Sequence, residues 1–91
     1  MSKIDNVKYT NISASAQIKA TPGAVYGFMV NSHTSGTLKL WDNTAGSGTV
    51  LLNTITFAAG PQHFSFPQGV SFNTALYATI GGTADITIFW S

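Results

Sequence analysis

The sequence predicts an all-β domain: an antiparallel β-sandwich of about 7–8 strands with a jelly-roll-like arrangement. Three observations support this fold class. Thr, Ser, Asn and Gly, which are weak helix formers, account for about two fifths of the chain, and no window has apolar residues at the spacing of a helix face. Apolar and polar residues alternate with period two in several segments. Clusters of turn-forming residues separate these segments at intervals of about 8–12 residues.

The first half of the chain contains three predicted strands, at residues 14–20, 24–31 and 36–43. The first strand alternates Ala and Ile with polar residues, and the TPG sequence that follows it is a turn. The second is apolar on both parities, which is typical of a strand covered on two faces. The third places Leu38 and Leu40 together on one face.

The second half continues the same pattern. Residues 49–57 form a long predicted strand, which residues 60–61, Gly-Pro, end because proline cannot donate to a central ladder. Phe64 and Phe66 belong to a short strand that the PQG sequence ends, and alternating apolar residues then continue to Ile80.

The clearest local motif lies near the C-terminus. Residues 81–84, with the sequence GGTA, join one alternating run that ends at Ile80 to a second run at residues 86–90. Two glycines between alternating runs are typical of a tight turn, so this segment predicts a β-hairpin.

The length and the charge of the chain limit the classes of protein to which it can belong. A chain of 91 residues and 9.6 kDa suffices for one core, and we expect a single β-sandwich domain at residues 7–91 after a flexible arm at residues 1–6. An apolar content of 44% and a net charge of only +1 argue against a disordered chain, and four scattered Lys with no Arg argue against a nucleic-acid partner bound through phosphates. We expect no membrane partner, because no apolar stretch approaches the roughly 20 residues of a spanning helix, and no disulfide, because the chain has no Cys.

Candidate catalytic and metal-binding residues are sparse, so we expect no enzyme, no cofactor and no metal. Asp42 and Asp85 are the carboxylates that could flank a substrate bond, but nothing in the sequence pairs them, and both are expected to serve turns. His33 and His63 are too few to supply the three or four ligands of a usual metal site.

Aromatic residues form the candidate interface because they cannot all face one core. In the strand at residues 24–31, we expect Tyr26 and Phe28 to lie on the face opposite Val25 and Met29. Loops and chain termini could cover these aromatic side chains, identical subunits could bury them, or glycans could stack on them. The candidate interface residues are Tyr26, Phe28, Trp41, Tyr77, Phe89 and Trp90.

The low charge favours burial between identical subunits. Soluble monomers guard the edge strands of a sheet with Lys, Glu, Pro or bulges, and three of the four Lys in this chain precede residue 20. Residues 49–57 and 86–90 combine strong β propensity with an absence of charge, which is the profile of an aggregating strand when it is exposed. A homo-oligomer would hide such edges.

Four segments resemble the small β-sandwich structural proteins of tailed bacteriophages. They are residues 37–43 (TLKLWDN), 49–57 (TVLLNTITF), 66–77 (FPQGVSFNTALY) and 82–89 (GTADITIF), so the resemblance covers about residues 24–90. Family members usually carry Gly where this chain has Ala75. The resemblance implies a virion location after synthesis in the host cytoplasm, and a non-enzymatic capsid decoration or head-fibre protein. It also implies self-association, often as a trimer, and docking on capsid or other virion proteins.

The alternative is a carbohydrate-binding β-sandwich module. In that case Trp41, Tyr26 or Tyr77 would stack on the pyranose rings of a glycan.

Overall fold

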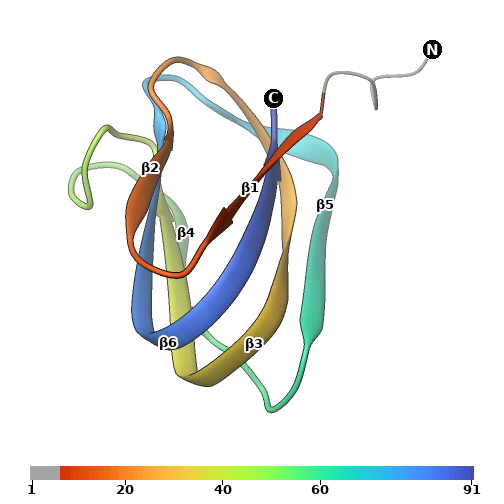
Figure 1. Cartoon of the computed structure of the whole chain (residues 1–91). Coiled ribbons are helices and arrows are strands. Elements are labelled where there is room, and N and C mark those ends of the chain that lie inside the picture. Colours follow the sequence, from red (N-terminus) through yellow and green to blue (C-terminus); the bar gives the residue numbers. More distant parts are fainter. Residues whose placement is uncertain (1–6) are drawn as a thin grey trace.

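The computed structural model describes residues 7–91, and the predicted arm at residues 1–6 lies outside the described residues. The described part of the chain forms one antiparallel sheet of six strands and contains no helix (Figure 1). The predicted all-β, antiparallel class is therefore confirmed. The strands are β1 (Lys8–Ile12), β2 (Ala16–Lys19), β3 (Gly23–Trp41), β4 (Val50–Thr56), β5 (Gln62–Phe72) and β6 (Leu76–Trp90).

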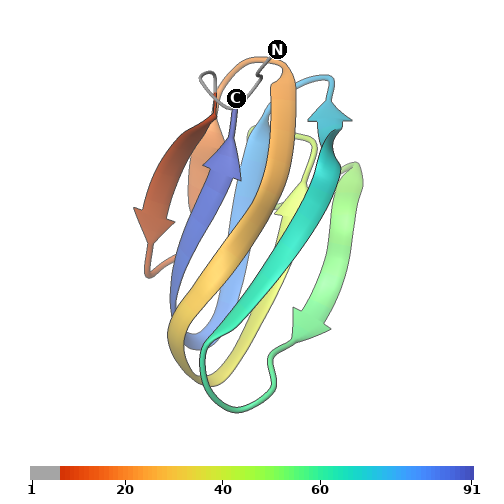
Figure 2. The ribbon, with the colours of Figure 1, turned by 90° about the vertical axis from the view of Figure 1, so that its right-hand side faces the viewer.

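The two longest strands, β3 and β6, form the centre of the sheet. They pair from Val25 opposite Trp90 to Trp41 opposite Tyr77. Each changes its outer neighbour midway: β3 pairs first with β5 and then with β4, whereas β6 pairs first with β2 and then with β1. Figure 1 shows that both strands bend between these two halves. Figure 2 shows β1 at one side of the molecule and β4 and β5 at the other.

The bend replaces the predicted hairpin at residues 81–84, and that prediction is wrong. Thr83 lies opposite Thr34 and Gly81 lies opposite Thr37, so both runs of β6 pair with β3 rather than with each other. The register shifts on the β3 side between Thr34 and Thr37, and such irregularities increase the local twist and bend. A glycine pair between alternating runs is compatible with a bend as well as with a turn.

The hydrophobic core lies on the inner face of the bent sheet and receives side chains from both halves. Leu38 and Leu40 share this face as predicted, while Lys39 and Trp41 lie on the outer face. Among residues 7–91 the core contains no buried polar side chain. The core cluster consists of Ile12, Val25, Phe28, Val30, Leu38, Leu40, Phe57, Phe72, Leu76, Ala78, Ala84, Ile86 and Ile88.

A β-bulge in β3 changes which side chains face the core. Val25 lies opposite Trp90, and the next ladder position joins Gly27 to Phe89, so β3 holds one extra residue, Tyr26, at this point. The extra residue shifts the alternation by one position. Val25 and Phe28 therefore both point inward, at 0% and 1% exposure. The prediction that Phe28 lies opposite Val25 is wrong.

The outer strands differ more from the sequence-based expectation. β4 at Val50–Thr56 matches the strand predicted at residues 49–57, and the Gly-Pro sequence lies in the connection after it. β5 continues past the predicted end at the PQG sequence, although residues 66–69 leave the ladder with β3. β1 was not predicted, because its sequence KYTNI alternates only weakly.

A substitution at Gly27 tests the β-bulge in β3. Its φ is +146°, and a Cβ there would overlap the main-chain carbonyl oxygen of Phe64. Gly27→Ala is expected to lower the free energy of unfolding by at least about 3 kcal/mol, because backbone strain and steric overlap add. Denaturant unfolding measures the loss.

Gly60→Ala is the matched control. Gly60 also has a positive φ, of +87°, but no neighbouring atom lies within 4 Å of the position that an added Cβ would take. Only the strain of about 1–2 kcal/mol should remain. Equal losses for the two variants would contradict the close approach at Gly27.

Candidate functional site

The six candidate interface residues do not form one surface. Phe28 belongs to the core, where its ring stacks on Phe64 with centroids 4.8 Å apart. At 1% exposure its side chain is not accessible to a partner, which corrects its place in the candidate interface. The other five side chains are partly exposed and lie in three separate places.

Trp41 and Tyr77 are cross-strand neighbours on the outer face of β3 and β6. The Trp41 Nε1–H donates a hydrogen bond of 3.0 Å to the Thr79 hydroxyl, and the Lys39 ammonium lies 4.3 Å from the centroid of the Trp41 ring. The loop after β3 passes over Tyr77, since a Cβ at Gly46 would lie 3.3 Å from its ring. The chain itself therefore occupies part of both aromatic surfaces.

Tyr26 and Trp90 lie near the end of β6. Gly69 packs against the Tyr26 ring, and the Tyr26 hydroxyl accepts a hydrogen bond of 3.4 Å from the Ser91 hydroxyl. Trp90 packs against the core, and its Nε1–H donates a hydrogen bond of 2.8 Å to the Thr10 hydroxyl. Both aromatic side chains thus hold neighbouring strands together.

Phe89 lies on the outer face of the half sheet formed by β1, β6 and β3. Its neighbour in β1 is Tyr9, which is 74% exposed, and its neighbour in β3 is Gly27, which has no side chain. Tyr9 was absent from the predicted interface because β1 was not predicted. The two rings are directly opposite each other in the β1–β6 ladder, with Tyr9 exposed and Phe89 partly exposed.

A polar cluster follows this aromatic pair along the same face. The side-chain amides of Asn11 and Asn31 both donate to Asp85 Oδ1, over 2.7 and 3.2 Å. Both also donate to the Thr87 hydroxyl, over 3.1 Å each. The hydrogen bond from Asn11, followed by that from Asn31, lowers the pKa of the Asp85 carboxyl below its usual range. Asp85 was expected to bind nearby backbone in a turn. That expectation is wrong, because Asp85 lies within β6 and binds two distant side chains.

Asp42 anchors the connection between β5 and β6. Its carboxylate accepts hydrogen bonds from the backbone N–H groups of Asn73 at 2.9 Å and Thr74 at 2.8 Å, with a longer one of 3.4 Å from Ala75. The bond from Asn73 contributes most to lowering the pKa of the Asp42 carboxyl. Asp42 lies beside the start of β6, whereas Asp85 lies near the bend of β6, so the fold does not pair the two carboxylates.

His33 connects the bend of β3 to the segment after β4. Its Nε2 bonds to the Ala58 carbonyl oxygen and its Nδ1 accepts the Gly36 N–H at 3.1 Å. In this arrangement Nδ1 is the acceptor and Nε2 is the donor. His63 lies on β5 opposite Met29. No group of three or more potential metal-ligating side chains occurs among residues 7–91.

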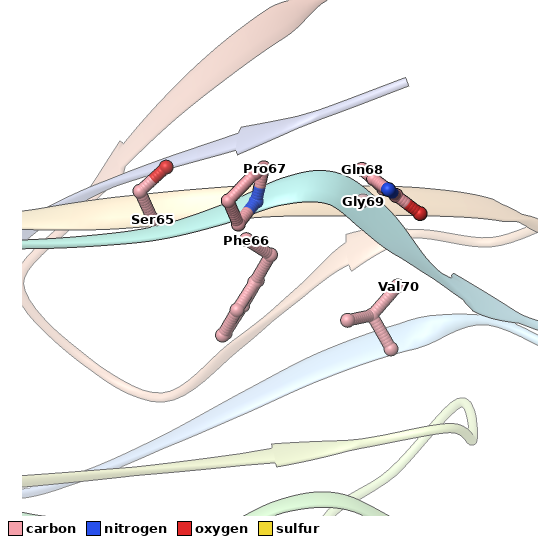
Figure 3. A pocket seen from close by; sticks show the side chains of 6 residues that line it. All are labelled: Ser65, Phe66, Pro67, Gln68, Gly69 and Val70. Atoms are coloured by element: carbon pink, nitrogen blue, oxygen red, sulfur yellow. The ribbon is translucent and has the colours of Figure 1, made fainter.

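An open depression lies on β5 where residues 66–69 leave the ladder (Figure 3). One continuous segment lines it, from Ser65 to Val70, and its polar side chains are those of Ser65 and Gln68. Pro67 is compatible with this position because β5 is an edge strand that pairs only with β3.

Comparisons with known proteins return no match to a family model, to a curated protein or to a solved structure. In the described part of the chain no helix has the length and apolar character needed to cross a membrane. The resemblance to phage structural proteins therefore stays a prediction that rests on the four quoted segments.

Asp42 provides a test of the β5–β6 anchor. Asp42→Asn is expected to lower the free energy of unfolding at neutral pH by roughly 1–2 kcal/mol, because the amide replaces a charged acceptor of backbone N–H groups at a partly exposed site. The folded-state pKa is depressed, so the carboxylate stabilises the fold above the unfolded-state value of about 3.9. This contribution is lost as the pH falls through the folded-state pKa.

Denaturant unfolding of both proteins between neutral pH and about pH 2 measures this effect, and the two curves should converge at the acid end. Asp85→Asn makes the same change of charge at a carboxylate that accepts, among the described residues, only from the side-chain amides of two exposed Asn residues, and it should cost less stability at neutral pH. A gap between wild type and Asp42→Asn that is constant with pH would contradict the anchor's dependence on charge.

Proposed function

We propose that this chain is a non-enzymatic structural protein of a tailed-phage virion. It acts as a capsid decoration or head-fibre component that forms a homotrimer and docks on other virion proteins. The observation that carries the proposal is the unguarded edge of β4. Its sequence VLLNTIT contains no ionised residue and no proline, and Val50 is 41% exposed.

The other edges of the sheet carry a charged residue or a proline, and β4 carries neither, although its register with β3 shifts at two places. β4 pairs only with β3, so its outer backbone N–H and C=O groups have no partner strand within residues 7–91. β1 contains Lys8, β2 contains Lys19, and β5 contains Pro67 within an irregular segment. Charge and proline each discourage pairing with another chain. β4 is therefore the edge best suited to a neighbouring subunit.

We also propose that the bent sheet is a jelly-roll sandwich. The register supports this, because counting each half of β3 and β6 separately yields eight strand segments in two groups. One group is β1, the second half of β6, the first half of β3, and β5. The other is β2, the first half of β6, the second half of β3, and β4. A jelly roll has two such four-stranded sheets, and viral capsid proteins use it.

The polar side chains also support a structural role. Asp42 and His33 hold backbone groups of distant segments, and Asp85 holds two side chains from neighbouring strands. Each of these groups serves to hold parts of the chain together, which suits a protein that works through contact area.

Thr54→Lys tests β4 as the subunit contact. Thr54 is exposed in the middle of β4, and a charged residue there would oppose pairing of this edge with another strand. Light scattering coupled to size-exclusion chromatography at micromolar concentration should give three times 9.6 kDa for wild type and 9.6 kDa for the variant.

Thr44→Lys makes the same substitution in the exposed loop after β3 and should keep the wild-type mass. A wild-type monomer would contradict the proposal. A wild-type dimer that Thr54→Lys dissociates would retain β4 as the contact and contradict the trimer.

A further inference from the structure

We propose that the outer face of β1, β6 and β3 is a binding site for a neutral glycan. The site joins the aromatic pair Tyr9 and Phe89 to the polar cluster of Asn11, Asn31 and Asp85. It includes none of the residues that the sequence suggested for glycan stacking, which were Trp41, Tyr26 and Tyr77, and it does not depend on the proposed assembly.

The aromatic pair provides an accessible apolar surface. Tyr9 and Phe89 are directly opposite each other in the β1–β6 ladder, where side chains on one face stand about 5 Å apart. Tyr9 is 74% exposed, and Gly27 on the far side of Phe89 leaves that flank without a side chain. The faces of aromatic rings are electron-rich, and they attract the C–H groups on the apolar face of a pyranose ring.

The polar cluster provides hydrogen-bond acceptors with fixed positions. A carboxylate only accepts, so Asn11 and Asn31 must each direct their NH₂ group at Asp85, and their amide oxygens point elsewhere. Both amides bind Asp85 Oδ1, whereas no hydrogen bond reaches Asp85 Oδ2 from residues 7–91. The cluster thus holds one carboxylate oxygen and two amide oxygens available to an external donor.

These acceptors define the class of ligand. Free acceptors require donors, and neighbouring sugar hydroxyls supply several donors from one ring. The negative charge of Asp85 disfavours glycans that carry carboxylate, sulfate or phosphate groups. Phe89 and Asp85 are four residues apart on β6, which is about 13 Å along a strand. A linear chain of two or three hexose units spans this distance, with one ring on the aromatic pair and another at the polar cluster.

The position of the site leaves the face accessible in an assembly built through β4. In the order β1-β6-β3-β4, the site lies over the first three strands and β4 lies at the opposite side of the sheet. Figure 2 shows the same separation of β1 from β4.

Calorimetric titration with cellohexaose, mannohexaose and maltohexaose tests the proposal. Wild type should bind at least one of them with a Kd in the millimolar range or below, and a hexamer of galacturonic acid should bind more weakly. Tyr9→Ala and Asp85→Ala should each weaken the affinity for the bound hexamer by about tenfold or more. Both side chains lie on the surface, and thermal unfolding verifies that each variant is folded.

Val70→Ala is the matched control, because Val70 is 36% exposed and lies in the depression on β5. It should bind like wild type. If Asp85→Ala fails to fold, Asp85→Asn removes the charge with little change of shape and should reduce the preference for the neutral hexamer. The proposal is overturned if no neutral hexamer binds at millimolar concentration. It is also overturned if Tyr9→Ala and Asp85→Ala bind like wild type, or if Val70→Ala alone loses binding.

Discussion

The pairing of β3 with β6 is the interaction on which the rest of the structure depends. Each of the other strands that the structure describes pairs with either β3 or β6, and none of them pairs with another outer strand. Both strands bend at the same level, so each presents an apolar inner face to its own other half, and the core forms between them. The outer strands then extend each half sideways, and their free edges become the boundaries of the molecule.

Much of the fold could be predicted because local alternation records which side chains share a face. Leu38 and Leu40 are in the core as the pattern indicated, and the strand at residues 49–57 exists with nearly the predicted bounds. The failures lie where the outcome depends on the partner strand. The bulge at Tyr26 reverses the faces of the residues that follow it, and the glycines near residue 81 lie at a bend because β3 continues beside them. The sequence pattern of one strand does not determine how that strand is aligned with its partner strand.

The candidate site was less predictable than the fold. The candidate aromatic residues were selected because they are too many for one core and because of their alternation along the predicted strands. The bulge shifts that alternation in β3, so Phe28 lies in the core. The residues of the exposed face are joined by long-range pairing: Asn11 meets Asp85 across 74 positions of the sequence. No spacing rule connects such residues, and the weak alternation of β1 was the signal that could have placed Tyr9 and Asn11 on one face. Asp42 shows the same limit, since its backbone partners lie more than thirty residues away.

The separation of β3 from β6 along the chain also determines how the molecule must fold. The two strands are separated by β4 and β5, so their pairing closes a long loop before most of the stabilising contacts exist. Sheets dominated by such non-local pairing fold over milliseconds to seconds rather than microseconds. During synthesis, β1, β2 and β3 leave the ribosome before β6, the strand with which all three pair. β4 can pair with β3 at once, but the apolar side chains of both strands stay exposed until β6 completes the core, at the stage when a nascent chain is most vulnerable to aggregation.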